Sequence, residues 1–316
     1  MNRYRALIVA VTCLLALVAA PWVGAPMAEG AREFILTQLR IPRVCMGALV
    51  GAVLGITGAA YQTIFANPLA TPSTVGTSAG ATLGALSVLV LSQGGQVVGL
   101  PILVVAAFVG ATIASLLAIG VASSGRASTE DIILAGIAVT LAASALAMGL
   151  QFQADINTTF AAVRWSLGSL MVIGFERVTV LAPLACVCVL LLLAQIRALG
   201  ALASGAERAR TQGVNVVRVR TVCLLGGALG VGACVALCGP IAFVGLIVPH
   251  LVRRGLGASH RILLPYSALV GATLLVGCDV LARTAWPGRE IPVGVLTAAL
   301  GAPALLVLLF RRRGAA

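Results

Sequence analysis

The sequence has no lysine, few aromatic residues and little charge: 4% of its 316 residues are aromatic and 9% are charged. Without lysine the chain cannot form a phosphate-binding loop of the G-x-x-x-x-G-K-[ST] kind or a lysine Schiff base. Its two histidines, His250 and His260, are not accompanied by carboxylates or cysteines at metal-ligand spacing. The sequence therefore excludes ATP hydrolysis by that route and indicates no metal site and no cofactor.

What the chain has instead is apolar sequence, with 60% hydrophobic residues and a mean hydropathy of +1.10. A helix of about 20 apolar residues crosses the hydrocarbon core of a bilayer. We therefore expect an all-α polytopic membrane protein with a single domain over residues 1–316. Ten spans are predicted, at residues 6–25, 44–64, 74–92, 100–122, 132–152, 177–196, 219–238, 241–251, 262–282 and 291–310.

Two of these spans leave alternatives open. The eighth, 241–251, is too short to cross alone, so we expect a broken or partly re-entrant segment that neighbouring helices shield. The first span follows the basic sequence NRYR and could instead be a signal peptide ending near VGAPMA. A membrane span is favoured, because the apolar stretch exceeds the usual signal-peptide length and meets no clean cleavage site.

Arginine supplies all of the basic side-chain charge that predicts orientation. With the N-terminus inside, fourteen arginines lie on the cytoplasmic side and seven on the outer side, so both termini are predicted to be cytoplasmic. The net charge of +12 then reflects topology and attraction to membrane lipid, and we infer no nucleic-acid binding. The cytoplasmic set is Arg3, Arg5, Arg126, Arg197, Arg208, Arg210, Arg218, Arg220, Arg253, Arg254, Arg261 and Arg311 to Arg313; the outer set is Arg32, Arg40, Arg43, Arg164, Arg177, Arg283 and Arg289.

All eight cysteines lie within predicted spans or at their edges, where cysteine behaves as a small apolar residue. No disulfide framework is implied. Cys234 and Cys238 share a helix face and could form a thiol or metal pair, but packing is the favoured interpretation.

One acidic residue, Asp279, lies clearly inside a late span. Intramembrane acids are functional by default, but a proton-driven transporter needs several carboxylates or inverted repeats. A membrane enzyme needs a nucleophile or metal constellation. We find neither pattern, so helix packing near Arg283 is the favoured role for Asp279, and proton-coupled secondary transport remains the alternative function.

Glycines recur at close-packing spacing in the second and third spans. Gly47, Gly51 and Gly55 stand four residues apart, and Gly76, Gly80 and Gly84 repeat the pattern. Such stripes let helix backbones approach closely, and plain packing accounts for most of them. A transport pathway is the added hypothesis, because the neutral, proline-rich stretch IFANPLATPSTVG (64–76) interrupts the apolar sequence between the two spans.

Several motifs carry a resemblance to a known family. In chain order these are RIPRVCMGALVGAVLGITGAAYQTIFANPLATPSTVGTSAGATLGA, DIILAGIAV, RWSLGSL, ERARTQGVNV, GPIAFVGLIVPHLVRR and REIPVGVLTAALGAPALLVLLFRR. From about residue 37 to 313 the chain resembles the permease subunits of ABC importers for iron chelates and vitamin B12. The resemblance implies a type II importer permease with ten spans in the bacterial inner membrane. It also implies a homodimer, two cytoplasmic ATP-binding subunits and a periplasmic substrate-binding protein.

The resemblance assigns a coupling role to the basic cytoplasmic segment at about 197–218. Glu207, Ala209 and Gly213 match positions one, three and seven of the E-A-A-x-x-x-G pattern of importer coupling loops. On charge alone the segment could be a solvated basic loop. Ser204-Gly205-Ala206 replaces the usual Leu-Gly before the acid, which leaves the details of docking open.

Other positions are assigned by the same resemblance. Arg40, Arg43 and Arg283 match arginines that related permeases offer to acidic residues of the binding protein, and a guanidinium suits carboxylates. Snorkelling interface arginines are the alternative. Asn67 and Thr129 match the cytoplasmic gate, where neutral polar groups on a proline-stiffened turn are suitable.

The cargo is the least specified feature. Haem, ferric siderophores and cobalamin all use this scaffold. Haem is slightly preferred, because its propionates suit outer arginines and the ring of Trp165, beside Arg164, could stack on a porphyrin. These two residues are therefore candidates for the translocation path.

Overall fold

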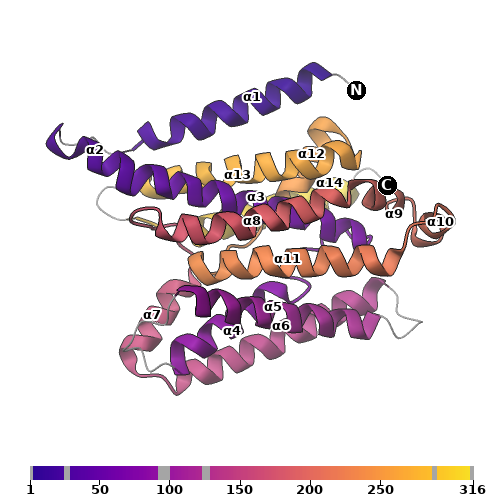
Figure 1. Ribbon diagram of the computed structural model, residues 1–316, viewed down its shortest axis with the longest axis horizontal. Helices are drawn as coiled ribbons and strands as arrows, with labels where there is room; N and C mark the ends of the chain where they lie inside the picture. Colours follow the sequence, from indigo (N-terminus) through magenta and orange to yellow (C-terminus); the bar gives the residue numbers. More distant parts are fainter. Residues whose placement is uncertain (1–2, 25–28, 92–99, 123–128, 287–289, 314–316) are drawn as a thin grey trace.

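The computed structural model describes residues 3–24, 29–91, 100–122, 129–286 and 290–313. Within these ranges the chain is helical and contains no strand, so the predicted all-α class is confirmed. Figure 1 shows the long helices lying side by side in a bundle. They are α1 (Arg3–Ala19), α3 (Ile41–Ile64), α4 (Thr77–Leu91), α5 (Leu100–Ala122), α6 (Thr129–Phe152), α8 (Glu176–Ala194), α11 (Val216–Cys238), α13 (His260–Thr284) and α14 (Val293–Arg313).

Shorter elements join these helices. A 3-10 turn (Ala20–Trp22) ends α1, and a second 3-10 turn (Glu29–Ala31), α2 (Arg32–Phe34) and a π-helical stretch (Ile35–Arg40) lead directly into α3. The remaining helices are α7 (Ile156–Ser166), α9 (Ile196–Leu202), α10 (Ala206–Thr211) and α12 (Val244–Leu256).

Helices α3 and α11 form the centre of the bundle. Of the apolar stretches that contain them, 78% is buried, against 17% for the stretch that contains α1. In Figure 1, α12 and α13 lie on one side of this centre and α4, α5 and α6 on the other, with α1 outermost. The sequence explains the difference, because α1 carries bulky apolar residues all round, whereas α3 and α11 are rich in glycine and alanine that admit neighbours closely.

The glycine stripes pack helices together, as the simpler interpretation predicted. A Cβ added to Gly51 on α3 would lie 2.2 Å from the Gly271 carbonyl oxygen of α13, and one added to Gly271 would lie 2.2 Å from the Gly51 oxygen. In the second stripe, a Cβ on Gly80 would lie 2.3 Å from the Gly110 oxygen of α5. These backbones touch so closely that no larger residue fits between them.

The predicted span boundaries agree with the long helices to within a few residues, but the count of ten is not confirmed. By length and composition, six helices among the described residues can cross a membrane, and three shorter apolar stretches lie within α4, α5 and α14, at Thr77–Leu91, Ile102–Ala118 and Val293–Leu305. For the predicted eighth span, the chain is non-helical at 239–243 and then forms the 13-residue α12. Phe243, at the start of α12, has a left-handed backbone with φ 67°.

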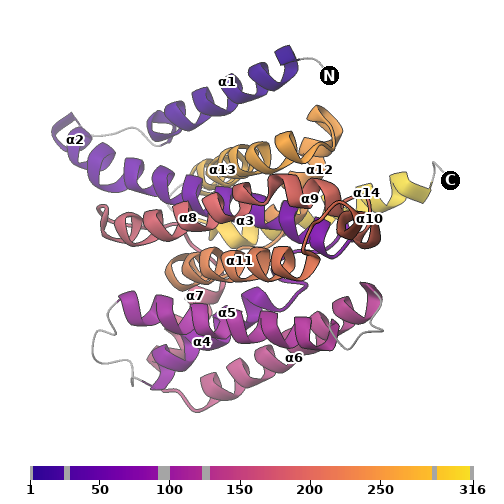
Figure 2. The same cartoon turned by 45° about the vertical axis from the view of Figure 1, so that its right-hand side comes forward.

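The segment predicted as a long cytoplasmic loop, 197–218, is mostly helical and contains α9 and α10. Figures 1 and 2 both place α9 and α10 at the end of the bundle where α1 begins and α14 ends. The start of α8 and the end of α13 lie at the opposite end. Helix α7, also at that opposite end, was not predicted, because its polar sequence INTTFAAVRWS gives no apolar run.

Candidate functional sites at the two ends of the bundle

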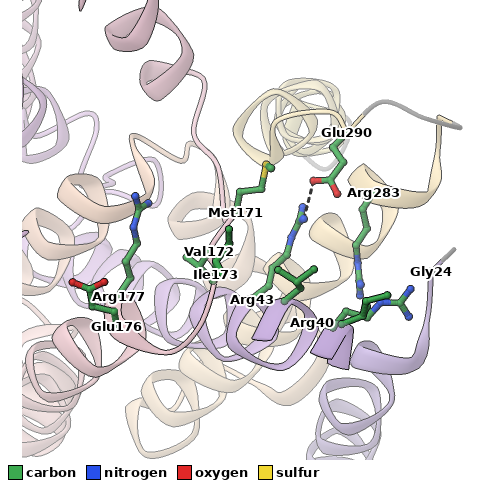
Figure 3. Close-up of a pocket in the computed structure, with 12 residues that line it drawn as sticks. Gly24, Arg40, Arg43, Met171, Val172, Ile173, Glu176, Arg177, Arg283 and Glu290 are labelled. Carbon is green, nitrogen blue, oxygen red and sulfur yellow. Dashed lines mark hydrogen bonds and ion pairs between the residues drawn. The ribbon is translucent and has the colours of Figure 1, made fainter. Parts of the chain in front are cut away.

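A cavity of about 610 Å³ lies at the end of the bundle where α13 finishes (Figure 3). We call it the Arg43 cavity. Its wall combines four arginines with two glutamates and is otherwise mainly apolar. The lining residues are Gly24, Ile35, Leu39, Arg40, Arg43, Met171, Val172, Ile173, Glu176, Arg177, Arg283 and Glu290.

Arg43 is held by two carboxylates from distant parts of the sequence. Its Nε lies 2.8 Å from Oδ1 and 3.0 Å from Oδ2 of Asp279 on α13, and its Nη1 lies 2.7 Å from Oε2 of Glu290. The side chains of Arg43 and Asp279 are 12% and 2% exposed, whereas that of Glu290 is 44% exposed. Asp279 therefore needs Arg43 as its counter-ion, while Glu290 is the partner that water and other molecules can reach.

The other two predicted docking arginines bind the end of α1. The Nη2 of Arg283 donates to the Ala20 carbonyl at 2.7 Å, and the Nη1 of Arg40 donates to the Pro21 carbonyl at 3.2 Å. The Ala20 carbonyl also accepts from the Val23 N–H at 3.3 Å, so Arg283 adds a second hydrogen bond at this helix end. Arg283 also lies at ion-pair distance from Asp279, 3.8 Å from Nε to Oδ2.

The structure thus brings Arg40, Arg43 and Arg283 together in one cavity, and their role in docking stays a prediction. The expected packing of Asp279 near Arg283 is also present, but Arg43 is its closer partner. Sequence reasoning missed Arg43 in that role and missed Glu290 altogether. Figure 3 shows Glu176 and Arg177 on the far side of Met171 from the Arg43–Glu290 pair.

The three residues matched to the coupling pattern lie on α10 or just after it, in three different environments. Ala209 is fully buried in the hydrophobic core. Glu207 is exposed and pairs with Arg210 one turn later, at 2.6 Å. Gly213 has φ 79°, and its N–H donates to the Arg210 carbonyl at 2.9 Å.

Gly213 closes α10 with a Schellman motif. The N–H of Val214 reaches back to the Ala209 carbonyl at 3.0 Å, which together with the Gly213 bond gives the 6→1 and 5→2 pair of that motif. The left-handed φ explains the glycine, because any side chain there would strain the backbone. The spacing of the pattern therefore has a local structural cause, independent of any partner.

The predicted gate residue Asn67 lies in a tight turn after α3. Its Oδ1 accepts from the Leu69 N–H at 2.7 Å, which is an Asx turn, and Ala66 before it has φ 47°. Thr71 and Thr74 then exchange hydrogen bonds, with Thr71 N–H to Thr74 Oγ1 at 2.8 Å. Thr129 is the first residue of α6, but its side chain lies outside the described part of the chain.

The predicted path residues lie at the end of α7. Asp155 caps this helix by accepting from the N–H of Asn157 at 3.1 Å. Arg164 is exposed. Trp165 is half-buried, packs against the core, and donates from Nε1 to the Ala236 carbonyl of α11 at 3.4 Å.

A second cavity, of about 800 Å³, lies at the other end of α3 and α13 and was not predicted. We call it the Arg253 cavity. It contains three arginines and two histidines, and none of its lining residues is acidic. The lining residues are Gln62, Thr63, Ile64, Ala66, Pro68, Leu202, Ala203, Gly205, Ala206, Arg220, His250, Arg253, Arg254, Ala258 and His260.

In the Arg253 cavity, the side chains of Arg253 and His260 form hydrogen bonds with neutral groups. Arg253 donates from Nη1 to Oε1 of Gln62, whose Nε2 donates to the Gly245 carbonyl at 3.3 Å. Thr63 Oγ1 and His260 Nε2 are 2.8 Å apart. The sequence could not show this cavity, because its basic residues come from α11, α12 and α13 and meet only in the folded bundle.

Within the described part of the chain, no three His, Cys, Asp or Glu side chains gather where they could hold a metal ion. Cys234 and Cys238 are buried among the apolar residues of α11, in agreement with the packing interpretation.

Known proteins resemble the chain over most of its length. It is 38% identical to the Fe(3+)-citrate import system permease of Bacillus subtilis (strain 168), with 88% of this chain and 82% of the relative covered. It is 38% identical to the hemin transport system permease of Yersinia pestis, with 88% and 84% covered. It is 39% identical to the cobalamin import system permease of Halobacterium salinarum, with 90% and 77% covered.

The fold has a close match among solved structures. A structure described as an inward-facing conformation of a metal-chelate type ABC transporter superposes with a TM-score of 0.85 at 28% identity, covering 96% of this chain and 99% of that one. With membrane-crossing helices and permeases as relatives, the chain is an integral membrane protein. The model of the FecCD transport family matches residues 6–311, so the chain belongs to the FecCD transport family.

Proposed function

We propose that this chain is the permease subunit of an ATP-driven importer that carries an iron chelate across the bacterial inner membrane. It works as a homodimer with two cytoplasmic ATP-binding subunits and a periplasmic binding protein. The main support for the proposal is the position of α10. This short helix lies at one end of the bundle, ends in the Gly213 Schellman motif and packs on the core through Ala209. A permease that has no lysine for a phosphate-binding loop needs such a contact to receive motion from a separate ATPase.

Charge supports the orientation. The arginine distribution of fourteen against seven supports a cytoplasmic position for the end with α10. The start of α1 and the end of α14 lie at that same end, in keeping with two cytoplasmic termini. The Arg43 cavity then faces the periplasm, and the Arg253 cavity faces the cytoplasm.

In this orientation the Arg43 cavity is the docking site for the binding protein. Arg40, Arg43 and Arg283 converge there, and guanidinium groups bind carboxylates in a bidentate manner. Because Glu290 already occupies Nη1 of Arg43, an acidic residue of the binding protein exchanges with Glu290 when it reaches that nitrogen. Docking is therefore an exchange of carboxylates.

The gate and the path follow the same orientation. Asn67 stands in the cytoplasmic turn after α3, and Thr129 begins α6 at the same end. Arg164 and Trp165 belong to α7 near the periplasmic end, where cargo enters. Haem is our preferred cargo, because an exposed arginine suits a propionate and a half-buried indole suits a porphyrin face. Relatives named for ferric citrate and cobalamin make a ferric siderophore or cobalamin the alternative.

Transport by proteoliposomes that contain the chain, its ATP-binding subunit and its binding protein tests the proposal. Uptake should require ATP and all three components.

Gly213→Ala, which strains the end of α10, and Glu207→Arg, which reverses an exposed charge, should lower the amount of cargo moved per ATP hydrolysed. The matched control is Gly277→Ala, because Gly277 is exposed on α13 and a Cβ there meets no atom within 4 Å. Uptake by the chain alone, driven by a proton gradient, would contradict the proposal.

A further inference from the structure

The Arg253 cavity has positive charge that nothing in the described chain balances. Arg220, Arg253 and Arg254 line it, yet none of them is in any of the ion pairs found among the described residues. The partner of Arg253 is the neutral amide of Gln62. The Nε of Arg220 is buried and has no hydrogen-bond partner. A buried donor without an acceptor is costly, so the arrangement calls for an anion from another molecule.

The cavity lies where the predicted membrane spans end. Of the helices able to cross a membrane, one ends at Ile64, one begins at Val216 and one begins at His260. Residues from all three helix ends line the cavity. Lipid head groups lie at this depth, and basic pockets between helix ends on the cytoplasmic side recognise anionic head groups.

The wall has the chemistry for a phosphate group. Guanidinium groups form charge-assisted, bidentate bonds with phosphate oxygens, and here they come from α11 and α12. Ile64, Pro68 and Leu202 give the same wall an apolar part that suits the glycerol end of a lipid. At about 800 Å³ the cavity is much larger than a single carboxylate side chain needs.

We propose that the Arg253 cavity is a binding site for a phosphate group, carried by the head group of an anionic phospholipid or by free inorganic phosphate. Gly205 and Ala206, the residues that begin α10, line the same cavity. An occupant therefore contacts the coupling segment and fixes its position against α12. The site does not depend on the identity of the cargo or on docking at the Arg43 cavity.

Native mass spectrometry of the full chain, extracted with the subunits that accompany it and then delipidated, tests this proposal. Phosphatidylglycerol and phosphatidylcholine are added back separately, and a third arm titrates inorganic phosphate and follows the melting temperature.

The variant Arg220→Gln/Arg254→Gln removes two cavity charges and leaves the Arg253–Gln62 bond. The control Arg218→Gln/Arg261→Gln removes two exposed arginines that do not line the cavity. Arg254→Gln alone, at an exposed position, serves if the double variant does not fold.

We expect the wild type and the control to retain phosphatidylglycerol in preference to phosphatidylcholine, and the cavity variant to bind it about tenfold more weakly. Stabilisation by inorganic phosphate without lipid retention would identify free phosphate as the source. Equal lipid retention by the cavity variant, or an equal loss in the control, would overturn the proposal. Retention of lipid by the chain freed of its ATP-binding subunit, but not by the complex that contains it, would overturn the proposal too, because the cavity would then receive a group of that subunit.

Discussion

The Arg43 and Arg253 cavities lie at opposite ends of α3 and α13 and are both rich in arginine, but they are neutralised differently. In the Arg43 cavity two carboxylates of the chain itself hold one guanidinium, at 2.7 to 3.0 Å. In the Arg253 cavity the guanidinium of Arg253 binds a neutral amide, and no lining residue is acidic. An anion that binds Nη1 of Arg43 must therefore displace a carboxylate, whereas an anion in the second cavity displaces none.

The two cavities also connect different sets of helices. The Arg43 network joins α3 to α13 and to Glu290 just before α14, so the proposed exchange at Glu290 would act directly on the segment that leads into α14. The Arg253 cavity joins α3, α12 and α13 to the start of α10. The same two helices thus connect the proposed docking cavity with a cavity next to the proposed coupling segment.

The largest expected effect comes from breaking the connection between the two cavities. Gly271→Val should prevent stable folding, because even a Cβ there lies 2.2 Å from the Gly51 oxygen, and a backbone atom cannot give way as the side chains of an ordinary overpacked core do. Gly277→Val, on the exposed side of the same helix, should fold and purify normally. Yield and melting temperature in detergent measure the contrast. Wild-type stability of Gly271→Val would show that the contact between α3 and α13 is loose.

The second prediction compares loss of one arginine from each cavity. Arg43→Gln leaves the buried carboxylate of Asp279 without its main partner, and breaking a buried ion pair costs about 3–5 kcal/mol. Arg253→Gln leaves only the Gln62 amide oxygen unsatisfied, at about 1–3 kcal/mol. Unfolding of the two variants in the same detergent should show the larger loss for Arg43→Gln. Adding Asp279→Asn to Arg43→Gln should recover part of it, and the absence of recovery would mean that Arg43 acts mainly through Glu290.

The sequence was sufficient for the features that depend on local pattern. Apolar runs located the long helices, glycine spacing indicated close packing, and the match at Gly213 agrees with a backbone that needs a left-handed residue. The sequence analysis did not predict features that depend on contacts between residues far apart in the chain. Nothing near Arg43 in the sequence points to Asp279 or Glu290, and the basic residues of the Arg253 cavity come from separate helices. Helix α7 was not predicted, because its sequence is too polar to form an apolar run.

The third prediction concerns carboxylate exchange at the Arg43 cavity and depends on the proposed docking. Glu290→Gln should tighten binding of the binding protein by about 1.4- to 5-fold, because it removes a competitor worth ~0.2–1 kcal/mol. Glu176→Gln changes the net charge equally but lies on the far side of Met171, so it should have less effect. Surface plasmon resonance at low and high salt measures both. Substituting Arg40 or Arg283 is less clean, because those arginines also hold the end of α1.

Two outcomes of that experiment separate the explanations. If the gain from Glu290→Gln disappears in an Arg43→Gln background, the glutamate competes for that guanidinium. If Glu290→Gln and Glu176→Gln have the same effect and both lose it at high salt, only the overall electrostatic field matters, and the exchange hypothesis fails.

The smallest expected effect is at Asp155, an exposed carboxylate that contrasts with buried Asp279. Hydrogen bonds from the side chain and backbone of Thr158, with a further one from the Asn157 N–H, hold the pKa of the Asp155 carboxyl below its usual 3.8. The stabilisation that this gives α7 is therefore complete above pH 3.8 and is lost as pH falls through the lowered pKa. Asparagine also caps helices, so Asp155→Asn should leave the melting temperature at neutral pH nearly unchanged and remove its dependence on acid. Asp279→Asn should lower the melting temperature at neutral pH, because it removes the charge that pairs with Arg43. Equal effects of the two substitutions at neutral pH would contradict the contrast between a water-exposed cap and a buried counter-ion.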